Sequence, residues 1–357
     1  NSQQNGVVNS IWDGTSDGEL DIELFGARNE TVSFNLILEA AQNTADDVTV
    51  SIGPLLHEQG NYTISSKPAQ GNELFNWVGR NIELFHVDYL KIEGLSRLSY
   101  PDYDERLVPE RFRRPFNIDP FGRAWANQGT TWEDRPDHDK YYPDIAVPIE
   151  LVDDFDIAAG QNQSIWGDIY IPTDAPTGTY TTTITVREEG QQAYTLPLEL
   201  EVKNFTLPDD PTSKTMVGVG DITKRYGTTN NAEVSDILDT HFQMAHRHRI
   251  SLINTGSDAD ADVWQQGRPD ARWESRLDGS LFTPDEGYAG PGVGVGNGVF
   301  SIGTYRDPLQ GRTQQQVWQK ADEWVNWFNQ LKQRTGQDTD YFGYRAKAEN
   351  ESALKRV

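Results

Sequence analysis

Residues 31–38 read Thr-Val-Ser-Phe-Asn-Leu-Ile-Leu, and this stretch is the strongest indication of the fold. Apolar side chains alternate with polar ones, and only Ile37 interrupts the polar face. Because successive side chains of a strand point to opposite faces of its sheet, this period of two predicts a strand with one buried face. Similar alternation returns at residues 48–52, 184–186 and 196–202, so the surrounding chain is expected to be β-structure.

Several such strands lie within residues 20–203, without a helical pattern between them. The sequence Glu188-Glu189-Gly190-Gln191 separates two of them as a hairpin turn, and residues 172–180 form a connection punctuated by proline and glycine. This organisation predicts an antiparallel β-sandwich, which we place at residues 1–203. Residues 100–145 show little periodicity. We interpret them as a long excursion that packs on a neighbouring domain or contacts a substrate.

The pattern changes after the sandwich. Residues 204–214 are rich in proline and predict a rigid linker. From residue 215 to 357, short apolar stretches alternate with helical periodicity, which predicts a parallel sheet. The expected strands lie at 215–220, 250–253, 299–302 and 340–345.

Four strand–helix units are half of an eight-stranded (β/α) barrel, which takes ~250 residues when complete. The predicted fold is therefore multidomain, with an antiparallel β-sandwich followed by the first half of a (β/α)8 barrel at residues 215–357, apparently incomplete. A half-barrel leaves open sheet edges. We expect the rest of the barrel or another chain to cover the open half.

Composition narrows the classes of partner. The net charge of −24 over 357 residues disfavours nucleic acid and anionic membranes as partners. No apolar run approaches the ~20 residues of a transmembrane segment, and the absence of cysteine excludes disulfides. The ten tryptophans suit sugar binding, although core packing is the alternative for each.

The chain begins at Asn1 rather than Met, and a removed signal peptide or a trimmed chain explains this. We expect a secreted bacterial protein, located outside the cell or at its surface.

A resemblance to a known family rests on segments that occur in order over most of residues 25–215. They are Ala27–Phe34, Tyr142–Pro148, Gly160–Trp166 continuing through Ile171-Pro172 to Pro176–Tyr180, and Phe205–Asp209. The chain resembles bacterial glycoside hydrolase family 123-like proteins, which carry an N-terminal sandwich and a C-terminal catalytic barrel. The resemblance implies a glycosidase-type scaffold, with a carbohydrate substrate or glycan as its partner.

In those relatives, an Asp-Glu pair follows the fourth barrel strand. The Glu is the general acid, and the Asp orients the acetamido group of the substrate. The matching place here is Ala348-Glu349, so Glu349 is the candidate general acid while Ala348 replaces the Asp. Glu349 also follows a predicted strand, and barrel active sites lie at the carboxyl ends of strands. A surface Glu at the start of a helix is the alternative. Lys347 and Arg345 are close in sequence, and if Glu349 faces either cation its pKa falls, which suits a base or ligand-holding role better than an acid.

Glycoside cleavage usually needs a second carboxylate or a substrate group in its place. Asp221 follows the first predicted strand and is the candidate for the second carboxylate. The candidates for substrate binding are the polar and aromatic residues near strand ends, namely Lys224, Arg225, Asn254, Tyr344 and Arg345. A capping or loop role is the alternative for Asp221, Lys224, Arg225 and Asn254.

Three other motifs were considered for metal or nucleotide binding. The alternate acids Asp258, Asp260 and Asp262 suit Ca²⁺ ligation, but they lack the glycine turn and later Glu of a full calcium loop, so a solvated acidic loop is the alternative. His241, His246 and His248 lie on or near one helix without the spacing of a zinc site. Residues 290–298 are rich in glycine but lack the ending of a phosphate loop, and we interpret them as a flexible active-site loop.

Two kinds of function stay open. The first is a glycoside hydrolase that acts on an extracellular polysaccharide or glycan and requires no cofactor. The second is a non-catalytic carbohydrate-binding or surface assembly protein that reuses the scaffold, which the replacement of the Asp by Ala348 favours.

Overall fold

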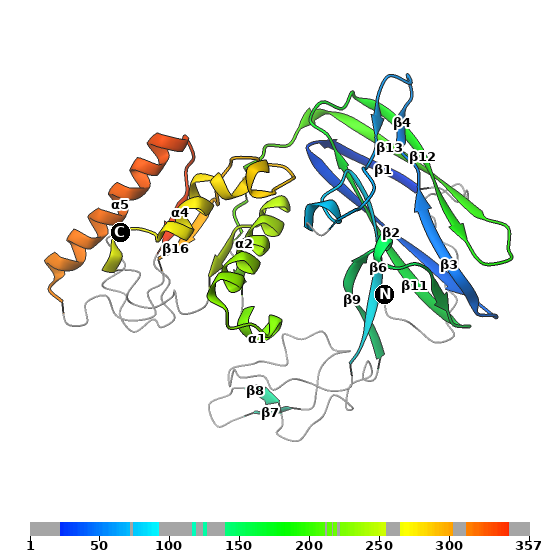
Figure 1. The fold of residues 1–357 in the computed structure, drawn as a ribbon, viewed down its shortest axis with the longest axis horizontal. Helices are drawn as coiled ribbons and strands as arrows, with labels where there is room; N and C mark the ends of the chain where they lie inside the picture. Colours follow the sequence, from blue (N-terminus) through cyan, green and yellow to red (C-terminus); the bar gives the residue numbers. More distant parts are fainter. Residues whose placement is uncertain are drawn as a thin grey trace. The chain divides into compact units, whose positions relative to one another are not determined.

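The computed structural model describes residues 22–71, 74–92, 116–118, 124–126, 140–210, 213–215, 217–219, 222–254, 265–302 and 312–342. These residues divide into two compact units (Figure 1). The first unit holds the described residues up to Gln70 and those from Arg80 to Thr206. The second unit holds the described residues of Gly71–Gly79 and those from Leu207 onward.

Two main sheets build the first unit (Figure 1). The seven-stranded sheet contains β1 (Ile22–Arg28), β3 (Ala45–Ile52), β4 (Leu55–His57), β5 (Thr63–Ile64), β10 (Phe155–Ile157), β12 (Gly178–Arg187) and β13 (Tyr194–Thr206). Its main order is β1-β13-β12-β3-β10. The four-stranded sheet has the order β2-β11-β6-β9, with β2 (Glu30–Ala40), β6 (Ile82–Ile92), β9 (Lys140–Pro148) and β11 (Gln161–Ile171).

The two sheets share one hydrophobic core, to which Phe34 and Ile165 contribute from one sheet and Tyr180 and Leu200 from the other. The alternation at residues 31–38 has the predicted effect. Phe34 and its alternate neighbour Val32 are buried, whereas the intervening polar side chains are exposed. The side-chain period therefore decides which face of β2 turns inward.

The prediction of an antiparallel sandwich is wrong for one pair of strands in the first unit. β1 pairs with β13 in parallel, with Ile22 opposite Leu198. These are the first and last described strands of the unit. Because a long stretch of chain connects them, their pairing is not restricted to the antiparallel hairpin geometry that a short turn imposes.

The predicted irregular excursion at residues 100–145 contains ordered strands. β7 (Phe116–Ile118) pairs with β8 (Ala124–Ala126), and β9 begins at Lys140. β9 lies at a sheet edge and contains Pro143 and Pro148. Edge strands tolerate proline because one side needs no ladder hydrogen bonds, and a mostly exposed edge strand shows no apolar alternation. The rest of the excursion lies outside the described residues.

The second unit contains two parallel strand pairs. β14 (Val217–Val219) pairs with β15 (Leu252–Asn254), and β16 (Val299–Ser301) pairs with β17 (Asp340–Phe342). Its helices are α1 (Ile222–Tyr226), α2 (Asn231–Arg247), α4 (Ala271–Asp278) and α5 (Gln314–Thr335). Short 3-10 turns occur at Leu74–Asn76, Ser280–Phe282 and Pro284–Glu286, and at Ile149–Leu151 in the first unit. Strands thus alternate with helices; that they form half of a barrel stays a prediction.

Aromatic side chains dominate the core of the second unit. Trp273 of α4 meets Phe242 of α2 edge-on at 5.2 Å between ring centroids, and Phe300 of β16 at 5.0 Å. Phe300 in turn contacts Trp324 and Phe328 of α5. Each of these rings buries a large apolar area, so the chain of contacts joins three helices to β16.

The glycine-rich residues 290–298 form an ordered connection in the second unit. Gly292 N–H donates to Asp209 Oδ1 at 3.2 Å, and Gly296 N–H donates to Gln337 Oε1 at 2.7 Å. A Cβ on Gly296 would collide with the backbone at Leu277, so glycine permits this close approach. These contacts do not support a flexible loop, and they assign the segment a packing role.

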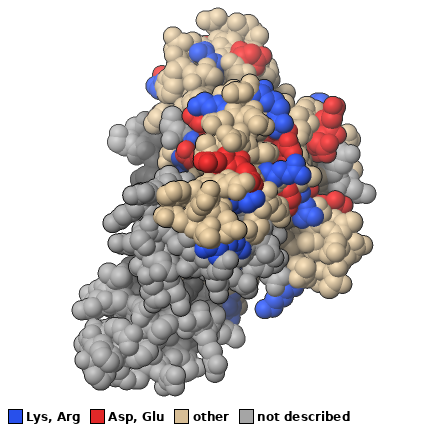
Figure 2. All heavy atoms as spheres, turned by 90° about the vertical axis from the view of Figure 1, so that its left-hand side faces the viewer, with Lys and Arg blue, Asp and Glu red and all other residues tan. Residues whose placement is uncertain are grey.

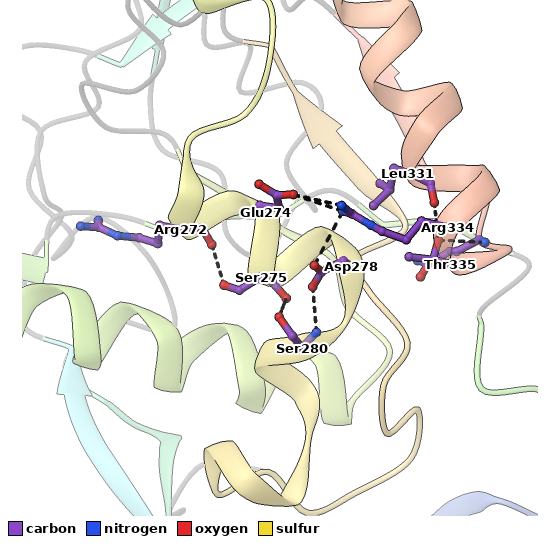
Figure 3. Close-up of polar contacts among 9 residues, drawn as sticks. Arg272, Glu274, Ser275, Asp278, Ser280, Leu331, Arg334 and Thr335 are labelled. Atoms are coloured by element: carbon purple, nitrogen blue, oxygen red, sulfur yellow. Dashed lines mark hydrogen bonds and ion pairs between the residues drawn. The ribbon is translucent and has the colours of Figure 1, made fainter.

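Charged side chains at the surface of the second unit pair locally. Arg334 of α5 reaches Glu274 Oε1 of α4 at 3.2 Å and Asp278 Oδ2 at 3.7 Å (Figure 3). Acidic and basic side chains lie intermixed on the face shown in Figure 2. No described helix combines the length and the low polarity needed to cross a membrane.

Candidate functional site

The carboxyl ends of the parallel strands are the first place to examine, because ligands bind there in α/β folds. In the pair β14–β15, Val219 lies opposite Asn254, so both strands end at the same edge. In the pair β16–β17, Ser301 lies opposite Phe342. β15 also contacts β16. The loops that follow β14 and β15 therefore leave from neighbouring points.

Only part of the predicted site lies among the described residues. Lys224 and Arg225 belong to α1, the short helix after β14, and both are exposed. Asn254 is the last residue of β15. The other candidates lie outside the described residues, namely Asp221, Asp258, Asp260, Asp262, Tyr344, Arg345 and Glu349.

A cavity of about 410 Å³ lies beside the end of β14. Its wall comes from β14, α1, α2 with the residue that follows it, and β15. The lining residues are Gly218, Val219, Ile222, Arg225, His241, Met244, Ala245, His248 and Leu252. Pockets of this volume accommodate small ligands or a single sugar unit of a longer chain.

The cavity wall from α2 follows directly from helical spacing. Met244, Ala245 and His248 follow His241 by three, four and seven positions, which places them on one side of the helix axis. Phe242 of the same helix points into the aromatic core. One side of α2 thus stabilises the unit while another lines the cavity.

His241 is one of three polar side chains in this wall, together with Arg225 and His248. Its Nε2 shares a hydrogen bond of 3.0 Å with the hydroxyl of Tyr226, and the two rings meet edge-on at 5.8 Å. Burial lowers the pKa of His241, and the nearby Arg225 lowers it further because two cations repel each other. His241 is therefore uncharged at neutral pH, and a neutral imidazole both donates and accepts hydrogen bonds.

The described cavity wall offers binding chemistry. It combines an apolar floor with one guanidinium and two imidazoles. None of its lining residues is a carboxylate. The described wall therefore offers hydrogen-bonding groups and an apolar surface to a ligand.

The sequence indicated the histidines of this wall but not their role. His241 and His248 were placed on or near one helix without the spacing of a zinc site, and Met244 was not singled out. The available signal was their spacing beside Arg225, which suggests a shared helix side. It did not show that a cavity lies there, because the cavity depends on how α1 and α2 pack on β14 and β15.

No group of three or more His, Cys, Asp or Glu side chains able to hold a metal ion occurs in the part of the chain that the structure describes. The predicted Ca²⁺ ligands lie outside that part.

The sequence matches no protein-family model and no curated protein. Among solved structures, a family 123 glycoside hydrolase from Clostridium perfringens that hydrolyses glycolipid glycans matches with a TM-score of 0.43 and 15% identity over 65% of this chain. This chain spans 32% of that protein. AvmM, which catalyses macrocyclisation in alchivemycin A biosynthesis, matches with a TM-score of 0.21 and 8% identity over 53% of this chain and 88% of its own. The first protein belongs to the family that the sequence motifs resemble, but at these TM-scores neither match establishes a fold or a function.

Proposed function

We propose that this protein is a carbohydrate-active protein of the glycoside hydrolase type. In this proposal the second unit forms the first half of a (β/α) barrel and binds a glycan at the carboxyl ends of its strands. The observation that carries the proposal is the parallel register of β14 with β15, because both strands end at one edge beside the cavity. The sequence motifs that resemble family 123-like proteins point to the same class of substrate.

The proposed division of roles follows the chemistry of glycoside cleavage. Glu349 acts as the general acid, and Asp221 or a group of the substrate supplies the second function. Substrate contacts come from Lys224, Arg225, Asn254, Tyr344 and Arg345. Arg225 has the most direct support in this set, because it lines the cavity together with His241.

A non-catalytic glycan-binding protein is the second candidate. One observation favours it. Ala348 stands where the resemblance expects an Asp. The proposal also includes secretion of the protein and a Ca²⁺ site at Asp258, Asp260 and Asp262. Metal analysis of the purified protein after dialysis against Ca²⁺ tests the Ca²⁺ site.

The deciding experiment compares the wild type with Glu349→Gln on a panel of neutral polysaccharides and glycolipid glycans, measured by release of reducing ends. Removal of the general acid is expected to lower turnover at least about 100-fold. Glu351→Gln is the matched control, since it makes the same change two positions along the chain. Unchanged turnover in Glu349→Gln removes this residue as the acid. Glycan binding without any turnover in the wild type favours the second candidate.

A further inference from the structure

The outer surface of the four-stranded sheet carries an exposed tryptophan, Trp166. It lies in β11, whose alternate residues Ile165 and Ile169 are buried in the core. Because side chains alternate along a strand, Trp166 points to the opposite face, where it is 40% exposed. Singly exposed apolar side chains are common at protein surfaces, and Trp318 is also exposed, so a role for Trp166 depends on the polar side chains that surround it.

Neighbouring strands surround Trp166 with polar side chains on the same face. Across β2, Asn35 lies opposite Trp166 and Ser33 lies opposite Asp168. On the other flank, Phe85 of β6 lies opposite Trp166 and is buried. The accessible part of this face therefore lies over β2 and β11. We call it the Trp166 face, comprising Thr31, Ser33, Asn35, Trp166, Asp168 and Tyr170.

Hydrogen bonds hold this face in a defined geometry. The indole Nε1–H of Trp166 donates to Asp168 Oδ1 at 2.8 Å, and the hydroxyl of Ser33 donates to the same oxygen at 2.6 Å. The hydroxyl of Ser164 donates to Asn35 Oδ1 at 2.5 Å. Since the only polar group of the indole is already bonded within the protein, the exposed part of the ring offers a ligand its carbon surface.

Hydrogen-bonding capacity remains around the ring. Within the described residues, no hydrogen bond is found to Asp168 Oδ2 or to the amide nitrogen of Asn35. Residues directly opposite in a sheet are about 5 Å apart, so these groups lie within reach of a molecule that stacks on Trp166. An apolar platform with polar groups at its border is complementary to a pyranose ring, which has an apolar face and a rim of hydroxyls.

Charge selects among the possible ligands. Neither β2 nor β11 contains Lys or Arg, and Asp168 lies at the centre of the face. An anionic glycan or nucleic acid would meet repulsion without a compensating cation. A lipid or purely apolar surface would bury the Asp168 carboxylate without a hydrogen-bond partner for its second oxygen, which costs free energy.

We propose that the Trp166 face is a second, non-catalytic binding site for uncharged sugar units of a glycan, separate from the strand-end site. The ligand class rests in part on the proposed function, whereas the location rests on the stacking surface and the fixed polar groups of this face. Trp166 contributes the stacking surface, and Asp168 and Asn35 bind hydroxyls of the same sugar.

The test measures binding of the full chain to cellohexaose, mannohexaose and chitohexaose by titration calorimetry, with oligogalacturonate as the anionic comparison. Trp166→Ala is expected to weaken binding about tenfold or more to the neutral oligosaccharide that the wild type binds. Trp318→Ala is the matched control, since Trp318 lies on α5 and is 46% exposed. It is expected to bind as the wild type does. Circular dichroism melting of both variants checks that each is folded.

Three results overturn the proposal: wild-type affinity in Trp166→Ala, no binding of any neutral oligosaccharide by the wild type, or tighter binding of oligogalacturonate. Wild-type self-association that Trp166→Ala abolishes would assign the face to a second copy instead. Failure of the proposed hydrolase function is distinguishable. It appears as absent turnover, while Trp166-dependent binding persists.

Discussion

Arg276 of α4 is a charged side chain that lies among the buried aromatic rings of the second unit. It is completely buried, with its guanidinium over the rings of Phe242 at 4.0 Å and Trp273 at 5.1 Å. Its only carboxylate partner in the described part of the chain is Asp239 of α2, at 2.7 Å from Nη2. Burial lowers the pKa of Arg276, and the hydrogen bonds that its guanidinium donates to Asp239 oppose this change. Asp239 and the two rings therefore maintain a cation inside an aromatic core.

Asp239→Asn tests this dependence. The substitution keeps the shape of the side chain but leaves the guanidinium of Arg276 without a counter-charge, so the free energy of unfolding is expected to fall by about 3 kcal/mol. Urea unfolding followed by tryptophan fluorescence measures the change. Arg334→Ala is the control, because its ion pairs are solvent-exposed and their loss is expected to cost less than about 1 kcal/mol. Similar losses in both variants would contradict the assigned role of burial.

We expect acid to destabilise the second unit through His246. Its ring stacks on Phe282 at 3.8 Å, and its Nε2–H donates to the carbonyl of Gly292 at 3.0 Å. Burial lowers the pKa of His246, and Arg249 lowers it further, against the opposing influence of the Gly292 hydrogen bond and Asp209. The unfolded chain therefore binds the proton more readily than the folded chain does.

This difference predicts the direction of a pH effect. The stability contributed by neutral His246 is complete above the unfolded pKa of about 6.5 and is lost progressively as the pH falls below it. His246→Phe retains a stacked ring that cannot titrate, so its unfolding free energy is expected to decrease less than that of the wild type between pH 7 and pH 5. Part of the decrease should remain, because burial also lowers the pKa of His86 and His241. An identical pH slope in both proteins would refute the assignment.

At the scale of elements, the contact between β2 and β11 depends on a glycine. Gly167 lies directly opposite Phe34 in the antiparallel register. A Cβ at residue 167 would collide with the Phe34 ring, which occupies the space that a side chain would need. The absence of a side chain therefore allows Phe34 to fill the core between the sheets.

Gly167→Ala is expected to lower the free energy of unfolding by about 1–3 kcal/mol, because the added methyl group overpacks the core. Gly298→Ala is the matched control, since a Cβ there would have its nearest neighbours at 3.7 Å, an ordinary contact distance. Equal stability of Gly167→Ala and Gly298→Ala in urea unfolding would show that Phe34 can move without cost.

At the scale of the whole molecule, two hydrophobic cores support two units. Asp239→Asn perturbs the second core, whereas Gly167→Ala perturbs the first. Amide hydrogen exchange measured by mass spectrometry is expected to show lower protection in α2 and α4 for Asp239→Asn and in β2 and β11 for Gly167→Ala. Loss of protection in all four elements for both variants would show that the two cores unfold as one.

How far the sequence predicts this molecule depends on the kind of pattern. The strands at residues 31–38 and 196–202 and the long helix α5 were predictable because each has a buried face with a regular period. β9 and α4 were not. β9 is an exposed edge strand with little apolar alternation, and α4 has only eight residues, with the charged Arg276 among its buried side chains. In the candidate site, Arg225 could be named from its place after a strand, but the cavity beside it could not.

The sequence alone determined the local period, the alternation of strands with helices in the second half, and the shortage of cations on β2 and β11. These properties depend on neighbouring residues, so they are present before the chain folds. The tertiary structure decided the parallel pairing of β1 with β13, the pairing of Asp239 with Arg276, and the meeting of Trp166 with Ser33 and Asn35 across two strands. Each of these joins residues that are distant in the sequence, and only packing of the sheets and helices on a shared core brings such residues together.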